Sequence, residues 1–437
     1  MTQRRLGSFL ATFGLACLTL FLPARAGALQ PLEAFIRSAR TKSPDNLEAQ
    51  ANRDQQSAQA NATLGRVLPG ISARGNYVHN EYQSVVDIPI DPTLPPQRVT
   101  IQPYNQRSGS GTLTVPLVDL AGFARTAAGY SASDGFKKQA DATALQVEAQ
   151  VVQNYYQLLA FLSLVVSSER ALEVARASLR LAQAQFDAGR ATRLDVDRAV
   201  AEVESRTQLL TVAQLNVALS ARALESASGL KPESLVAVDF QDDLHEEADL
   251  ASFSPPDTAL PAIAATMKLT ESADQQALAQ KLTLFPTITG NFTENYTNAA
   301  GFVGHQWSWQ IGVGFTWLLD VTTIYNMVAF DAAANAARAR EQRARLAGRD
   351  AIHTFWQTVH SAIANSRSAR AQVKAAASAA RLAKDRYEAG AATQLDLLQA
   401  QRDEYTADVS RIRADADLAN ARTQLRLAAG VDPFAEK

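Results

Sequence analysis

The chain has 437 residues, of which 47% are hydrophobic, 20% charged and 7% aromatic. This composition excludes a disordered tail and a collagen-like chain. Lys and Arg number 42 and Asp and Glu number 44, so the net charge is only −2 and a nucleic-acid partner is not expected. The single cysteine, Cys17, excludes a disulfide framework and a cysteine metal site.

Residues 1–26 have the three parts of a secretory signal. Two arginines near the start precede an apolar run over 9–22, and small residues lead up to Ala26. We expect cleavage after Ala26, with Ala28 as the second choice, and therefore an exported mature chain. Lipidation at Cys17 is not expected, because the apolar run continues beyond it.

The rest of the chain contains no run of about 18 apolar residues, so only strands could carry it across a membrane. Residues 305–318 alternate large apolar with small or polar side chains over a full membrane-crossing length. Trp307 and Trp309 near one end and Trp317 near the other resemble the two aromatic girdles of a transmembrane strand. Residues 286–297 alternate in the same way and are expected to pair with this strand as a hairpin.

Two further strands are expected at about 71–82 and 108–117, joined by a proline-rich loop over 84–107. Pro116 is expected to end the pairing of the second of them. Four strands cannot close a barrel, and open sheet edges are not tolerated in lipid. We therefore predict that three protomers supply twelve strands, with the Thr, Asn, Ser and Gln faces lining a polar lumen.

The chain is a tandem duplication with an offset of 201 residues. The segment 181–196 aligns with 382–397 without a gap, and Asp119 aligns with Asp320 at the same offset. A unit of this length is too long for an ordinary solenoid repeat. We predict a first repeat over 27–230, an equatorial linker over 231–257 and a second repeat over 258–437.

Each repeat predicts a helical hairpin with a turn of about three residues. In the first repeat, Gly189 suits the left-handed position that ends a helix, and Thr192 suits the N-cap of the next helix. Asp195 completes a variant of the capping box, and this structural role is its main expected one. The second repeat has the same signals at Gly390, Thr393 and Asp396. The tips are expected at about 188–192 and 389–393.

The flanking segments 121–187 and 322–388 contain no proline and are rich in Ala, Gln, Arg and Glu, which predicts unbroken helices. At about 1.5 Å per residue, each helix would be roughly 100 Å long. Helices of this length do not belong to a globular core, so we expect rods that pack along one another.

In order and spacing, these features resemble the TolC-type outer-membrane efflux protein family over essentially the whole mature chain. The resemblance is carried by the tandem repeat, by the hairpin segments 186–196 and 387–397, and by the strand-to-helix junction Val-Pro-Leu-Val-Asp at 115–119. It implies a membrane α+β fold, in which a homotrimer forms a twelve-stranded β-barrel in the outer membrane of a Gram-negative bacterium. Each protomer supplies four strands, and a long periplasmic α-helical barrel continues the β-barrel.

The resemblance also implies partners and a function. The expected partners are outer-membrane lipid, a periplasmic membrane-fusion adaptor at the hairpin tips, and an inner-membrane pump of the RND or ABC type. The implied function is a passive exit duct of a tripartite efflux pump or a type I secretion system, without a bound cofactor.

The resemblance places an acidic constriction of the periplasmic entrance at the second tip. Asp396 falls on one position of this ring, and Gln399 stands where some members carry a second acid. We further expect that Arg193 pairs with an acidic group of a neighbouring tip and helps to hold the entrance closed. The residues expected at the adaptor contact are Gly189, Arg190, Thr192, Arg193, Asp195, Gly390, Thr393 and Gln394.

The sequence contains no nucleophile elbow, phosphate-binding loop or zinc-binding HExxH pattern, so an enzyme is not expected. The five histidines have no metal-ligand spacing. The main alternative is a periplasmic coiled-coil adaptor or scaffold that uses the same hairpins without a pore. The strand with three tryptophans favours the channel, because a soluble scaffold has no use for aromatic girdles at membrane-crossing separation.

Overall fold

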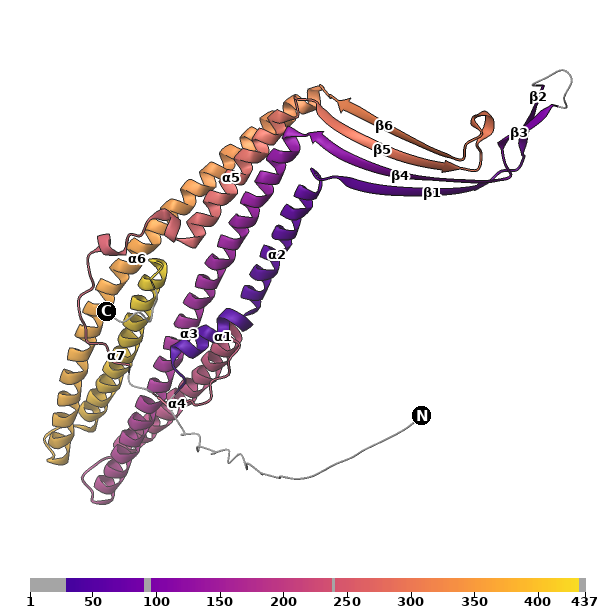
Figure 1. The fold of residues 1–437 in the computed structure, drawn as a ribbon. Helices are drawn as coiled ribbons and strands as arrows, with labels where there is room; N and C mark the ends of the chain where they lie inside the picture. The colour runs from indigo at the N-terminus through magenta and orange to yellow at the C-terminus, as the bar shows by residue number, and fades with distance from the viewer. Residues whose placement is uncertain (1–28, 90–95, 238–239, 432–437) are drawn as a thin grey trace, which may run out of the picture.

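The computed structural model describes residues 29–89, 96–237 and 240–431, which form a long bundle of helices that meets a β-sheet at one end (Figure 1). The predicted signal segment and both expected cleavage positions lie outside the described residues. Within the described ranges, no helix is both long enough and apolar enough to span a membrane.

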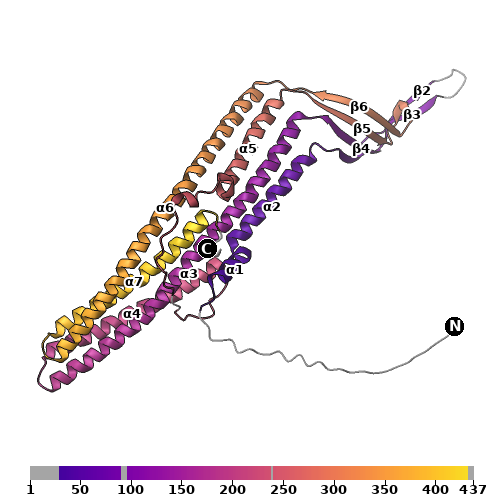
Figure 2. The same ribbon diagram turned by 60° about the vertical axis from the view of Figure 1, so that its left-hand side comes forward.

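Two helical hairpins form the bundle. Helix α3 (Leu120–Asp187) turns into α4 (Arg193–Ser228), and α6 (Val321–Glu388) turns into α7 (Gln394–Ala428). Helices α3 and α6 have 68 residues each, which confirms the predicted rods. Because neither contains proline, their backbone hydrogen bonds run without a break. Both hairpin tips lie at the end of the molecule that is remote from the sheet (Figures 1 and 2).

Three shorter helices pack along the hairpins. Helix α2 (Pro44–Gly65) lies along α3, and α5 (Pro261–Leu282) contacts both α3 and α6. Both begin with proline, which suits the first position of a helix because its missing N–H has no partner there. Helix α1 (Leu32–Lys42) packs on α3 and α4 at mid-length (Figure 2). The bundle is therefore thickest in its middle and thins toward the tips.

Each hairpin has an apolar core of its own. In the first, Phe35 of α1 packs with Leu158 of α3 and Leu224 of α4, and all three are fully buried. In the second, Val359 of α6 packs with Leu418 of α7. Burying side chains of this size stabilises each hairpin by about 1.5 to 3 kcal/mol per residue.

The sheet is antiparallel and has the strand order β1-β4-β5-β6. Strand β1 (Gly70–His79) pairs with β4 (Asn105–Val118), β4 pairs with β5 (Thr287–Thr297), and β5 pairs with β6 (Trp307–Thr316). Each repeat supplies two neighbouring strands, so the pairing of β4 with β5 joins the two repeats in one sheet.

Strand β4 continues past Pro116, so the prediction that pairing ends there is wrong. Pro116 lies opposite Thr289, and an irregularity follows before Val118 pairs with Ile288. A bulge interrupts the ladder locally, so the missing N–H of proline is tolerated beside it.

The segment over 84–107, expected to be a loop, contains a hairpin of β2 (Ser84–Ile88) and β3 (Gln97–Gln102). Val86 lies opposite Val99 in this pair. Residues with branched Cβ atoms favour strands, and the prolines of the segment all lie outside β2 and β3. The hairpin projects beyond the end of the sheet that is remote from the helices (Figure 1).

Candidate functional site

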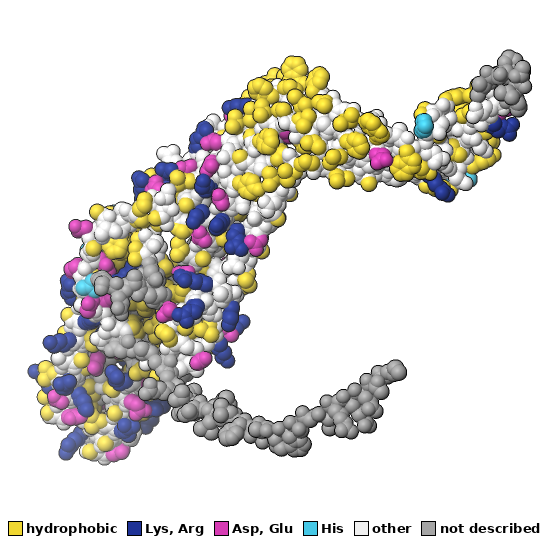
Figure 3. Space-filling model, in the orientation of Figure 1, with side chains coloured by type: hydrophobic (Ala, Val, Ile, Leu, Met, Phe, Trp, Pro, Cys, Tyr) yellow, Lys and Arg dark blue, Asp and Glu magenta, His cyan; other side chains and the backbone are white. Residues whose placement is uncertain are grey.

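The strand register gives the sheet one apolar face. In β6, every odd position from Trp307 to Phe315 is apolar, and the residues opposite them in β5 lie on the same face. The rings of Tyr296 and Trp307 lie 5.0 Å apart between their centroids. Hydrophobic side chains gather over the strands and the adjoining helix ends, whereas charged side chains cover the helices (Figure 3). The apolar residues of this face are Trp307, Trp309, Ile311, Val313 and Phe315 in β6, Ile288, Phe292 and Tyr296 in β5, and Leu113 and Ile71 beyond them, and Glu294 and Arg107 lie on the same face toward the end at Trp307.

The opposite face of the same strands is polar. Hydroxyl and amide side chains from β4 and β5 face each other across the register, and the hydroxyls of Thr112 and Thr293 lie 3.1 Å apart. Successive strand residues point to opposite sides, so a single alternating pattern separates the two faces across all four strands. Lipid on one side and water on the other would satisfy both faces.

The three predicted girdle tryptophans lie at the two ends of this surface. Trp307 and Trp309 begin β6, and their exposed fractions in the single protomer are 63% and 70%. Trp317 follows the end of β6, and its indole Nε1 donates a hydrogen bond of 2.9 Å to the carbonyl of Leu284. The girdle role itself stays a prediction, but the placement fits it.

The two tips are built alike. In the first, Gly189 has a φ of +72°, and Asp195 Oδ2 accepts hydrogen bonds from the backbone N–H and the hydroxyl of Thr192. In the second, Gly390 has a φ of +75°, and Asp396 repeats these contacts with Thr393. Both predicted capping boxes are confirmed.

These hydrogen bonds lower the pKa of both aspartates. The Thr393 hydroxyl and backbone N–H hold the pKa of Asp396 below its ordinary value of 3.8, and Thr192 does the same for Asp195. The contribution of these hydrogen bonds to folding stability is therefore fully present at pH values above the ordinary pKa. It is lost only as the pH falls through the lowered pKa of the folded protein. Both carboxylates stay charged at neutral pH, so Asp396 offers a fixed negative charge at the second tip.

The other expected tip residues differ in their exposure and in their bonding partners. Arg190 is exposed, and Gln399 donates to Asp403 of the same helix at 2.9 Å. Within the protomer, Arg193 pairs with Asp197, four residues on in α4, at 3.1 Å, and its pairing with a neighbouring tip stays a prediction. Gln394 is only 3% exposed, so in the protomer its side chain is not offered to a partner as the sequence led us to expect. Gln394 is buried at the first position of α7 although its side chain is polar.

A buried ionic seam joins the two hairpins, and sequence reasoning missed it. Glu202 of α4, which is 3% exposed, accepts from Arg206 at 2.7 Å and from Arg402 of α7 at 2.6 Å. The Arg206 guanidinium lies 4.6 Å from the centre of the Tyr405 ring, and the Tyr405 hydroxyl lies 3.0 Å from that of Ser168 in α3. In the sequence, only the spacing of Glu202 and Arg206 on one helix indicates an ion pair. The contact with Arg402 gives no such signal, because Arg402 comes from the other repeat.

A cavity of about 240 Å³ borders this seam. Its lining includes Glu202, Arg206 and Tyr405 of the seam besides Arg170, Glu404 and Asp408, and burial raises the pKa of Glu404. The seam residues Glu202, Arg206, Arg402 and Tyr405 thus connect the hairpins through an ion pair, a contact of Arg206 with the Tyr405 ring and a hydrogen bond between hydroxyls.

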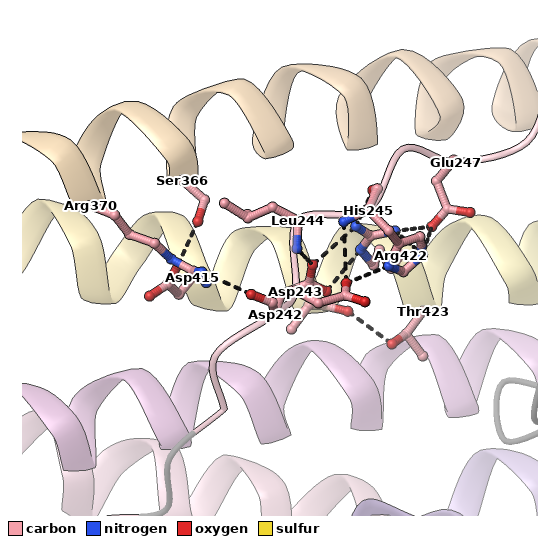
Figure 4. Close-up of polar contacts among 11 residues, drawn as sticks. Asp242, Asp243, Leu244, His245, Glu247, Ser366, Arg370, Asp415, Arg422 and Thr423 are labelled. Atoms are coloured by element: carbon pink, nitrogen blue, oxygen red, sulfur yellow. Dashed lines mark hydrogen bonds and ion pairs between the residues drawn. The ribbon is translucent and has the colours of Figure 1, made fainter.

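The linker between the repeats forms a strap across the second hairpin. Arg422 of α7, 5% exposed, donates to the Asp242 carboxylate at 3.0 Å and to the carbonyl of His245 at 2.7 Å (Figure 4). It also donates to the Glu247 carboxylate and to His245 Nε2. One buried guanidinium therefore fastens three linker residues, a compensation that buried charge requires.

Further contacts extend the strap along the hairpin. Arg370 of α6 pairs with Asp415 of α7 at 2.9 Å and donates to the carbonyl of Asp242 at 2.8 Å (Figure 4). The Trp356 indole donates to the carbonyl of Ala248 at 3.0 Å. The linker contains the short 3-10 helices η1 (Leu250–Phe253) and η2 (Asp257–Ala259) before α5 begins.

The strap also holds the one group of described residues with metal-ligand proximity. Possible ligand atoms of Asp242, Asp243 and His245 lie within 4.8 Å of one another. Arg422 contacts both carboxylate oxygens of Asp242 and donates to His245 Nε2. A guanidinium in this position opposes a second cation, so the arrangement suits arginine rather than a metal.

A sheet with one apolar and one polar face, continued by helical hairpins of this length, is the architecture of an outer-membrane channel protomer. The chain matches the family model described as Outer membrane efflux protein over residues 35–230 and 260–431, and it belongs to this family. The proteins of known structure that it resembles are channels and not enzymes. Membership implies the outer membrane of a Gram-negative bacterium, with a periplasmic extension.

Three solved structures illustrate the shared fold. They are the CmeC outer membrane channel of Campylobacter jejuni, the outer membrane protein VceC of Vibrio cholerae, and the MtrE outer membrane channel of Neisseria gonorrhoeae in its open state. The sequence identities are 18%, 17% and 18%, and the TM-scores are 0.78, 0.76 and 0.70. The matches cover 93%, 92% and 92% of this chain and 88%, 96% and 90% of the other chains. The comparison with curated proteins gave no match.

Thr393→Ala tests the capping of the second tip. Loss of the N-cap side chain is expected to cost about 1 kcal/mol, because the first turn of α7 loses the partner of a free N–H. Hydrogen exchange in the first turn of α7 should then become roughly five times faster. Thr192→Ala is the matched control and should change only the first turn of α4. Equal exchange in all three proteins would show that capping does not stabilise the tips.

Arg422→Met tests the strap. The change leaves Asp242 and Glu247 without their buried cation, and breaking such a pair is expected to cost about 3 to 5 kcal/mol. The segment 240–253 should then become cleavable in limited proteolysis while the helices persist. Arg413→Met, an exposed arginine of the same helix, should leave the cleavage pattern of the parent protein unchanged. A strap that stays resistant in Arg422→Met would mean that its apolar contacts suffice.

Proposed function

We propose that this chain is the outer-membrane exit duct of a tripartite efflux pump or a type I secretion system, and that it conducts cargo passively. The observation that carries the proposal is the sheet, which has an apolar and a polar face and ends in two open edges. Strands β1 and β6 each have only one neighbour within the described protomer. In lipid, unpaired backbone groups cost several kcal/mol each, so these edges need partners.

A homotrimer satisfies the edges. Three copies of the four-stranded sheet give a closed barrel of twelve strands if β6 of one protomer pairs with β1 of the next. The apolar face then meets outer-membrane lipid, and the hydroxyl and amide face lines a water-filled lumen. A barrel of this size is wide enough for such a lumen.

The helices provide the periplasmic part of the duct. A helix of 68 residues is roughly 100 Å long, which suits a helical barrel that crosses much of the periplasm. The exposed tips would meet a periplasmic membrane-fusion adaptor, and an inner-membrane pump of the RND or ABC type would supply the energy. Of the expected contact residues, Arg190 and Arg193 are the exposed charged ones on the first tip and would suit an acidic surface of the adaptor.

The second tip would form the entrance. Asp396 carries a charge at neutral pH and is exposed, as a pore-lining ring requires, and Gln399 lies one helical turn further on. The ionic seam connects each second hairpin to the first hairpin of the same protomer. Opening would consist of an iris-like movement of the hairpins, biased by adaptor contact.

A periplasmic adaptor or scaffold without a pore is the alternative. The apolar face of the sheet argues against it, because exposed tryptophan, isoleucine and phenylalanine side chains on β1, β5 and β6 would promote aggregation in water.

Planar-bilayer recording of the detergent-extracted protein, together with its oligomer mass, tests the duct. The expected result is discrete channels from a trimer. A species that is extracted without detergent and gives no channel would overturn the barrel and support the scaffold.

Glu202→Gln tests the coupling between the hairpins. The change leaves Arg206 buried without its carboxylate and weakens the contact with Arg402, so the second hairpin should move outward more readily. We expect a larger conductance and a longer open time in bilayers than for the parent protein. Glu204→Gln alters an exposed residue of the same helix and serves as the control. Identical conductance in the parent protein and Glu202→Gln would show that the seam does not limit opening.

A further inference from the structure

We propose that Arg74 makes the membrane segment of the duct selective for anions. The inference deepens the proposed function and rests on it, because it needs the lumen of a closed barrel. Arg74 lies in β1, where it is opposite Ser110 of β4. Ser110 lies opposite Asn295 of β5, and Asn295 lies opposite Ser308 of β6. Arg74 therefore belongs to the polar face at a level where its neighbours are neutral.

Arg74 is the only charged residue on the polar face of the four strands. The remaining positions of that face carry hydroxyl or amide groups, or else small or apolar side chains. The two other charged residues of these strands, Arg107 and Glu294, lie on the opposite face, at positions paired with Tyr77 and Trp309. The polar-face residues of β4, β5 and β6 around Arg74 are Ser108, Ser110, Thr112, Thr293, Asn295, Thr297, Ser308 and Gln310.

The charge of Arg74 is not neutralised within the protomer. Its guanidinium forms no ion pair with any described residue, and its side chain is exposed. It lines a shallow hollow of about 250 Å³ together with Asn76, Ser108, Ser110 and Asn295. All of these neighbours have a hydrogen-bond acceptor, but none carries a negative charge.

Threefold symmetry would repeat this cation three times at one level of the lumen. A ring of arginine side chains attracts anions and repels cations, as in pores selective for anions or phosphate groups. Because the other lumen groups of the strands are neutral, these three charges set the sign of the potential in the membrane segment. The second tip presents Asp396, so the two ends of the duct would carry fixed charges of opposite sign.

The distance over which the ring of Arg74 side chains acts on ions depends on the ionic strength. The Debye length is about 30 Å at 0.01 M and about 10 Å at 0.1 M ionic strength, so the ring acts across the whole lumen only at low salt. Anion selectivity should therefore fall as the salt concentration rises, which distinguishes a wide charged ring from a tight binding site.

The test measures the reversal potential of the full-length trimer in planar bilayers under a KCl gradient. Arg74→Gln should lower the ratio of chloride to potassium permeability by about twofold or more, and Arg74→Glu should lower it further. Arg74→Lys should keep the parent ratio. Arg107→Gln removes the same charge from the other face of the sheet and should also leave the permeability ratio of the parent protein unchanged. Because every variant retains the tips, Asp396 contributes equally to each measurement.

A second form of the test avoids variants that fail to fold. The only cysteine of the chain is Cys17, within the predicted signal segment, so Arg74→Cys gives the mature protein one thiol. A cationic methanethiosulfonate reagent applied to open channels should restore the parent selectivity, and an anionic one should drive it toward cations. Equal permeability ratios in the parent, Arg74→Gln and Arg74→Glu channels, or no response of the Cys variant to either reagent, would overturn the proposal. Absence of channels from the parent protein would instead overturn the duct itself.

Discussion

The backbone of a membrane segment must satisfy its own hydrogen bonds, and the rest of this structure depends on that constraint. Four strands with two open edges would be incomplete in lipid, and the proposed trimer answers this by pairing the edges of neighbouring protomers. The pairing of β4 with β5 brings the two repeats into one sheet, and it thereby also sets the two helical hairpins side by side. The tips, the seam and the strap all lie on the helical hairpins, and the sheet joins these hairpins at their opposite end.

The helical part solves a different problem, because rods this long cannot share a single apolar core. Buried apolar side chains stabilise the hairpins near mid-length, and nearer the tips an ion pair between Glu202 and Arg402 and hydrogen bonds such as that between Ser178 and Gln401 join them. A buried ion pair contributes little net stability but is costly to break. In the proposed duct, the pair between the buried Glu202 and the half-exposed Arg402 would hold the two hairpins in one arrangement until the entrance opens.

The two repeats cover the middle of their helical hairpins with different segments. In the first, α1 packs its apolar residues against α3 and α4, and Arg40 reaches the buried Glu148 at 2.6 Å. In the second, a linker without a long helix takes the corresponding place, and Arg422 fastens it through Asp242, His245 and Glu247. The two repeats thus share the hairpins and their capping boxes, while their connections differ, one packed mainly by apolar residues and the other also fastened by charges.

The sequence by itself determined what depends on near neighbours. Proline-free stretches and the signals around Gly189 and Gly390 define the helices and their turns, because capping acts over three or four residues. Alternation with a period of two defines the strands and both faces of the sheet. Only the tertiary structure decided which residues from distant segments meet. Arg402 joins Glu202 across 200 residues, and Arg422 joins Asp242 across 180. It also decided that Gln394 is buried, that the segment after β1 forms a hairpin, and that Arg74 stands alone on the polar face. Strand register and helix packing fix such contacts, and neither leaves a periodic trace in the sequence.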